Sequence, residues 1–188
     1  TESLQKIVEQ ALPLISVHSD NIFMNPYFFA KVEKLYNDMD NLGLTQEQKM
    51  TLKKLYNSFV KNGIALGEAE QARMREINME LSSLSNTFGN HLLAENNAFA
   101  EEFGVTISEY AGAMATTEDR TLREKMFKAY SSRGNNGNEN DNKELIMKMM
   151  ALRVEKAKLL GYDNPAQMIL ADKMAGTPEA VDVFLADI

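Results

Sequence analysis

The sequence contains no cysteine, and it has only two histidines and four prolines among 188 residues. Without cysteine the chain cannot form disulfides, thiolate metal sites or a cysteine nucleophile. No run approaches the roughly 18 consecutive apolar residues that a membrane span requires. The net charge is -7, and the sequence has no arginine-rich segment, so it lacks the basic surface typical of a nucleic-acid-binding protein. We therefore expect neither a membrane nor a nucleic acid as partner.

The composition is that of a globular protein, with 44% hydrophobic and 25% charged residues. A chain of this length can bury a core of its own, so we expect residues 1–188 to form a single helical region, with a possible sub-boundary near residues 99–116. The chain opens on Thr1 without an initiator methionine or a basic-then-apolar leader pattern. We therefore expect an internal, N-terminal-side fragment of a longer protein, in which the helix begun at Thr177 continues beyond Ile188.

Helix-start signals recur along the chain. Three of them pair an N-cap residue with proline at the first helical position: Asn25-Pro26, Asn164-Pro165 and Thr177-Pro178. A fourth is a capping box, in which Thr45 and Gln48 satisfy each other's backbone N–H groups. We expect Pro13 to kink or end the first helix and Gly43 to stop the second.

Apolar residues recur at helical spacing nearly throughout, and no segment alternates convincingly as a strand would. The most regular stretch is Glu68 to Ala98, where apolar residues follow steps of three and four as in the seam of a helical hairpin: Met74, Ile77, Leu81, Leu84 and Phe88. The pattern predicts an all-α fold, a bundle of long antiparallel helices that is part of a larger helical structure. The same apolar face leaves open an alternative, a stand-alone helical protein-interaction module.

Two histidines are the obvious candidates for chemistry. His91 lies four residues before Glu95, which would place both on one helix face as a metal pair, but a catalytic zinc normally needs a third protein ligand and none recurs at helical spacing. His18 stands beside Ser19 and Asp20, either of which could cap the following segment. We expect both histidines to be structural.

Two further segments have a ligand-rich composition. The loop "GNNGNENDN" offers many oxygen atoms, but neither glycine, placed at the sixth position of an EF-hand loop, brings an acidic residue to the first or twelfth position. The clustered methionines Met147, Met149 and Met150 are expected to fill a core rather than to bind copper. The phosphate-binding glycine motifs and the serine-hydrolase elbow are also missing from the sequence. We therefore assign no catalytic, cofactor-binding or metal-binding residue.

Four segments nevertheless occur in a familiar order: "HSDNIFMNPYFFAKVEKLY", "REINMELSSLSNTFGNHLLAENNAF", "RTLREKMFKAYSSRGNNGNENDN" and "LRVEKAKLLGYDNPAQMILADKMAGTPEAVDVFL". In this order they resemble family M3 of the zinc metallopeptidases, the thimet oligopeptidase-like enzymes, and among them most nearly the bacterial peptidyl-dipeptidases. One departure is the connection "AEEFGVTISEYAGAMATTED", which is shorter than the family's usual stretch.

The resemblance implies a large helical enzyme that cleaves short peptides in a deep channel, with zinc held by an H-E-x-x-H helix and a later glutamate. Neither His18 nor His91 is followed by Glu, and no H-E-x-x-H exists in the chain. In the family that motif lies downstream of the segments found here. The resemblance therefore implies a cytoplasmic peptidase whose zinc ligands lie outside this chain, which would contribute walls of the substrate channel and pack on the rest of its own polypeptide.

Overall fold

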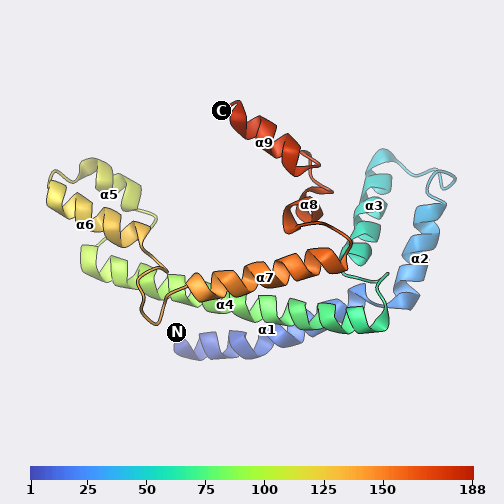
Figure 1. The fold of residues 1–188 in the computed structure, drawn as a ribbon, viewed down its shortest axis with the longest axis horizontal. Coiled ribbons are helices and arrows are strands. Elements are labelled where there is room, and N and C mark those ends of the chain that lie inside the picture. The colour runs from blue at the N-terminus through green and yellow to red at the C-terminus, as the bar shows by residue number, and fades with distance from the viewer. The chain divides into compact units, whose positions relative to one another are not determined.

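The computed structural model describes the backbone of residues 1–188 and the side chains of Thr1 and of residues 3–188. Within that part of the chain every regular element is a helix (Figure 1), as the all-α prediction requires. The elements are α1 (Glu2–Phe23), α2 (Pro26–Asn37), α3 (Gln46–Lys61), α4 (Glu68–Phe103), α5 (Tyr110–Thr116), α6 (Arg120–Ser131), α7 (Lys143–Leu159), α8 (Pro165–Leu170) and α9 (Pro178–Ala186). None of the helices in the described residues is long and apolar enough to cross a membrane.

The four predicted helix starts are confirmed by their hydrogen bonds. The side chain of Asn25 accepts from the first-turn amides of α2, and Thr45 and Gln48 form the reciprocal capping box of α3. The Asn164 side chain accepts from the Gln167 amide at the start of α8, and the Thr177 hydroxyl accepts from the amide of the third residue of α9. Each cap supplies an acceptor to an amide that has no partner inside its helix.

Three boundaries differ from prediction. Helix α1 runs through Pro13, so Pro13 does not end the first helix. Helix α2 ends at Asn37 instead of Gly43, which lies beyond it in a turn at a φ of 62°. Residues 68–103 form one unbroken helix, so a hairpin within Glu68 to Ala98 is wrong. Within unit 2, side-chain bonds described below join α4 to α7.

The chain divides into two compact units. Unit 1 comprises residues 1–6 and 83–150, and unit 2 comprises residues 7–82 and 151–188. Each is described by itself. The boundaries between the units fall inside helices, and the sub-boundary near residues 99–116 remains a prediction.

Unit 1 is organised around Phe99 of α4, which is buried together with Met126 of α6. The ring of Phe99 lies 4.8 Å from that of Phe103 and meets Tyr110 and Tyr130 edge-on. The rings of Tyr110 and Tyr130 stack at 3.9 Å, which joins α5 to α6. This aromatic cluster is the core of unit 1.

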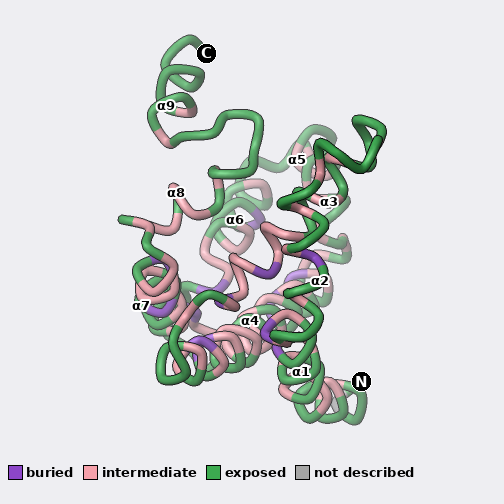
Figure 2. The backbone as a smooth tube through the Cα atoms, turned by 90° about the vertical axis from the view of Figure 1, so that its right-hand side faces the viewer, coloured by how far each residue is buried: buried purple, intermediate pink, exposed green. Residues whose placement is uncertain are grey.

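Unit 2 is organised around Phe59 of α3, which is fully buried. Its ring makes contacts at 5.2 to 5.6 Å with Phe23, Phe28 and Phe29. Helices α2 and α3 pack side by side. Met74 and Ile77, in the part of α4 that belongs to unit 2, are also fully buried. In Figure 2 the buried positions are few, and α9 is exposed for most of its length.

Candidate functional site

A chain of polar side chains crosses three helices of unit 2. The Lys156 ammonium on α7 donates to Asn78 Oδ1 at 2.6 Å, and Asn78 Nδ2 on α4 donates to Asp20 Oδ1 on α1 at 2.8 Å. Asp20 is only 4% exposed. Burial raises the pKa of Asp20 above its usual 3.8, with the hydrogen bond from Asn78 opposing that rise. The Asn78 amide therefore separates a buried carboxylate from a desolvated ammonium.

Lys156 forms the cationic end of this chain. Burial lowers the pKa of Lys156 from its usual 10.5, and the negative charge of Asp20 opposes that shift. Its position is set by a neighbouring ion pair, because Arg73 of α4 donates to both oxygens of Glu155 at 2.7 and 2.9 Å. This bidentate pair ties α7 to α4 one residue before Lys156.

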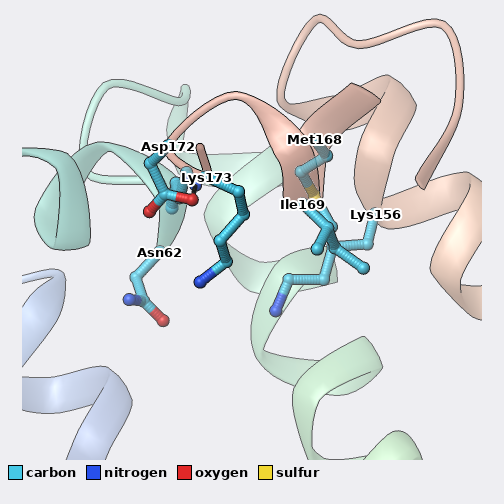
Figure 3. Close-up of a pocket in the computed structure, with 7 residues that line it drawn as sticks. Asn62, Lys156, Met168, Ile169, Asp172 and Lys173 are labelled. Atoms are coloured by element: carbon cyan, nitrogen blue, oxygen red, sulfur yellow. Dashed lines mark ion pairs between the residues drawn. The ribbon is translucent and has the colours of Figure 1, made fainter. Parts of the chain in front are cut away.

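Lys156 lines a cavity (Figure 3) that shares Asp172 and Lys173 with a second cavity. The first, of about 290 Å³, is lined by residues of α3, α7 and α8 and of the segment after α8. The second, of about 650 Å³, continues along α3. Five lysines line the two cavities, which we call the lysine groove: Lys53, Lys54, Lys61, Lys156 and Lys173.

Among the described residues, one carboxylate lines the lysine groove, that of Asp172. The Lys61 ammonium lies 2.9 Å from Asp172 Oδ1, and this hydrogen bond holds the pKa of Asp172 below its usual 3.8. Asp172 therefore neutralises one lysine and stays ionised at neutral pH. In Figure 3 the ammonium ends of Lys156 and Lys173 point to the same side of the cavity, which makes a cationic surface able to accept an anion.

A second polar cluster lies in unit 1 around Glu95, which is 7% exposed. Its carboxylate accepts from the Gly134 amide at 2.7 Å, from Asn136 Nδ2 at 3.0 Å and from Asn138 Nδ2 at 3.2 Å. The asparagine-rich loop thus folds over a buried carboxylate and supplies it with N–H donors in place of a cation. Its role is to fix the loop.

His91, four residues before Glu95 on α4, bonds to a different residue. Its Nδ1 lies 2.9 Å from Oδ1 of Asn142, a side chain that is 1% exposed and also reaches the Phe88 carbonyl. Gly134, at a φ of 71°, packs against Asn142, and a Cβ there would lie 3.0 Å from Asn142 Nδ2. His91 and Glu95 thus make separate structural contacts, His91 with Asn142 and Glu95 with the Gly134 amide.

The two histidines and the clustered methionines, the other residues considered in the sequence analysis, do not come together in one site. His18 is exposed on α1 and belongs to unit 2, whereas His91 belongs to unit 1. The expectation that the clustered methionines fill a core is wrong for Met147 and Met150, which are 71% and 47% exposed. Helix α7 is apolar on more than one face, so periodicity could not tell which side would be covered.

Sequence reasoning missed the lysine groove. Lys61 and Lys156 lie almost a hundred positions apart, and a lysine on an amphipathic helix is typical of a solvated face. The one available signal is the lysine pair Lys53-Lys54, which does not identify its partners on α7 and α8. Only the tertiary packing brings these charges together.

The chain is similar in sequence to peptidases. A family model described as Peptidase family M3 matches residues 113–188. Dipeptidyl carboxypeptidase from Escherichia coli (strain K12) is 28% identical over 219 residues, covering 100% of this chain and 32% of that protein. Oligopeptidase A from the same organism is 30% identical over 220 residues, covering 98% and 32%. Probable cytosolic oligopeptidase A from Arabidopsis thaliana is 45% identical over 76 residues, covering 40% and 11%.

The chain therefore spans about a third of the length of the curated bacterial relatives that it matches. The alignments are longer than the chain, so these relatives contain segments that it lacks.

Proposed function

Because the chain belongs to peptidase family M3, we propose that it is the helical, non-catalytic portion of a peptidyl-dipeptidase or oligopeptidase that cleaves short peptides. The observation that carries the proposal is the alignment of the entire chain with a third of a dipeptidyl carboxypeptidase. The other two thirds of such a protein would hold the residues that cleave the peptide bond. This chain would contribute walls of the channel through which the peptide reaches them.

The donor chemistry of the chain supports this division of labour. The family's zinc requires two histidines within H-E-x-x-H, and neither His18 nor His91 is followed by glutamate. Among the described residues no group of three or more His, Asp or Glu side chains could hold a metal. His91 and Glu95 instead bond to the loop and to Asn142. These residues do not fit the zinc site, so we assign them no step of hydrolysis.

The helical architecture supports a channel wall. Long rigid helices can border an opening that admits an extended peptide and excludes a folded protein. Unit 2 presents the lysine groove on such helices, and this concave surface is the best candidate for contact with a peptide. A cytoplasmic location stays a prediction, since relatives named cytosolic and relatives named chloroplastic or mitochondrial both match.

The test compares the 188-residue chain with the product of its complete reading frame. We expect the long product to contain H-E-x-x-H and to hydrolyse a short peptide in a chelator-sensitive manner. The purified chain should bind no stoichiometric zinc and release no product. Chelator-sensitive turnover by the chain alone would contradict its non-catalytic role. A complete reading frame without the motif would instead support the interaction module.

A further inference from the structure

We propose that the lysine groove of unit 2 binds the carboxylate of a short peptide. The proposal rests on the proposed peptidase function for the choice of a peptide, and it adds a recognition site and a charge preference. The similarity to family M3 assigns no role to the residues of this groove. Its occupant is defined by chemistry, namely one carboxylate group attached to an apolar or amide-containing body.

The charge of the groove is the first argument. Five lysines and one aspartate line it, whereas the whole chain has a net charge of -7. Lysines scattered at random over an acidic surface would lie among carboxylates. Of the side chains that the structure describes, Asp172 alone brings a carboxylate to these two cavities, and Lys61 already neutralises it. A concave surface of one sign raises the local concentration of oppositely charged ligands.

The hydrogen-bonding capacity of Lys156 is the second argument. An ammonium group has three donors, and within the described residues one acceptor, Asn78 Oδ1, lies within hydrogen-bond distance. Asp20 lies behind Asn78 and is bonded to it, so it leaves the groove side of Lys156 open. A carboxylate in the groove would supply a second acceptor and a counter-charge.

Lys173 completes the anion site. It is exposed, and no ion pair of the described side chains includes it. In Figure 3 its ammonium end faces the same space as that of Lys156, from the segment that follows α8. The two cations therefore approach one ligand from separate elements, as a carboxylate with two oxygens requires.

The apolar wall favours a peptide over a simple anion. Met168 and Ile169 of α8 line the same cavity, and Ile169 is 53% exposed. An apolar side chain resting on them would remove that surface from water. The cavities of about 290 and 650 Å³ are near the usual size of small-ligand sites, about 300–1,000 Å³.

The experiment titrates the 188-residue chain with four N-acetylated dipeptides and follows the backbone amide signals of residues 168–174 by NMR. Acetyl-alanyl-glutamine has only a C-terminal carboxylate, and acetyl-alanyl-glutamate amide has only a side-chain carboxylate. Acetyl-alanyl-glutamate has both, and acetyl-alanyl-glutamine amide has neither. Inorganic phosphate is titrated separately. We expect the carboxylate-bearing peptides to bind and the doubly neutral peptide to shift no signal. The two single-carboxylate peptides tell which source the groove prefers.

Variants locate the binding. K173Q removes an exposed charge and should weaken binding about 2- to 5-fold, the effect of one exposed ion pair. K156M removes the half-buried donor and should weaken binding about 10-fold. K158Q, an exposed lysine on α7 outside both cavities, is the matched control and should bind like the unchanged chain. K173Q keeps the test valid if K156M unfolds.

Equal binding of the doubly neutral peptide, or no binding of any peptide, would overturn the proposal. Binding of phosphate without binding of the peptides would also overturn it and would indicate an anion site of another class. Equal losses in K158Q and K173Q would assign the effect to overall charge. None of these results depends on hydrolysis, so the peptidase function could stand while this proposal falls.

Discussion

Replacing Glu95 with glutamine tests whether the buried carboxylate holds the loop of unit 1. One carboxylate oxygen accepts from Gly134 N and Asn136 Nδ2, and the other accepts from Asn136 Nδ2 and Asn138 Nδ2. Glutamine turns one of these oxygens into an N–H₂ donor that faces donors. It should keep its carbonyl oxygen on Gly134, whose bond is the shortest, and leave Asn138 without an acceptor.

The expected cost follows from that geometry. A hydrogen bond to a charged acceptor contributes about 1.5–3 kcal/mol, and E95Q loses one such bond and weakens the others by removing the charge. We expect the free energy of unfolding of unit 1 to fall by about 2–3 kcal/mol, within the range for breaking a buried polar network. E95A, which removes every acceptor, should cost more.

The assay is urea unfolding combined with hydrogen exchange at the Gly134 amide, which reports on the loop itself. The control is E101Q, an exposed carboxylate on the same helix and in the same unit. If E95Q stayed within about 0.5 kcal/mol of the unchanged chain, the ordinary range for surface substitutions, the carboxylate would not be what fixes the loop.

Three further predictions concern single positions. G134A should lower the stability of unit 1 by about 1–3 kcal/mol, because it strains a positive φ and places a Cβ 3.0 Å from Asn142; calorimetry showing an unchanged melting temperature would contradict this. F59A should cost about 3–5 kcal/mol, with F59L costing less, because Phe59 is fully buried among three aromatic rings; equal urea midpoints for the two variants would argue against a packing role. Hydrogen bonds from the Lys143 backbone and side chain and from the Gly137 amide lower the pKa of Asp141 below its usual 3.8, so the native state binds fewer protons there than the unfolded state. Its stabilisation is present above 3.8 and is lost as pH falls through the lowered pKa; D141N should therefore flatten the decrease in urea midpoint between about pH 5 and about pH 2.

Local signals predicted local structure well. The Asn-Pro, Thr-Pro and capping-box starts each fix a backbone amide within a few residues of its acceptor, so they could be recognised without knowledge of the fold. The end of α2 was missed because Gly43 permits a turn without requiring the helix to reach it. Pro13 marks a position where a helix either kinks or ends, and the sequence alone did not tell that α1 continues through it.

The spacing of apolar and charged residues could not predict the lysine groove. Lys61, Lys156 and Lys173 belong to three separate elements, and nothing in the spacing of any one element indicates the others. Glu95 was noticed for its position relative to His91, yet its actual partners come from a loop about forty positions away. The N–H donors of a loop do not recur at helical spacing, so the sequence pattern could not identify them as partners of Glu95.

The hydrogen bonds of the loop over Glu95 also affect the deamidation of its Asn136-Gly137 step. An Asn-Gly step deamidates when the glycine nitrogen attacks the asparagine side-chain carbonyl, closes a succinimide ring and expels ammonia. In the folded loop the Asn136 amide donates to Glu95, and the Gly137 nitrogen donates to Asp141 at 2.8 Å. Both reacting groups are thus held in other bonds, and ring closure would have to break them. The same contacts that order the loop therefore lengthen the chemical lifetime of its most labile dipeptide.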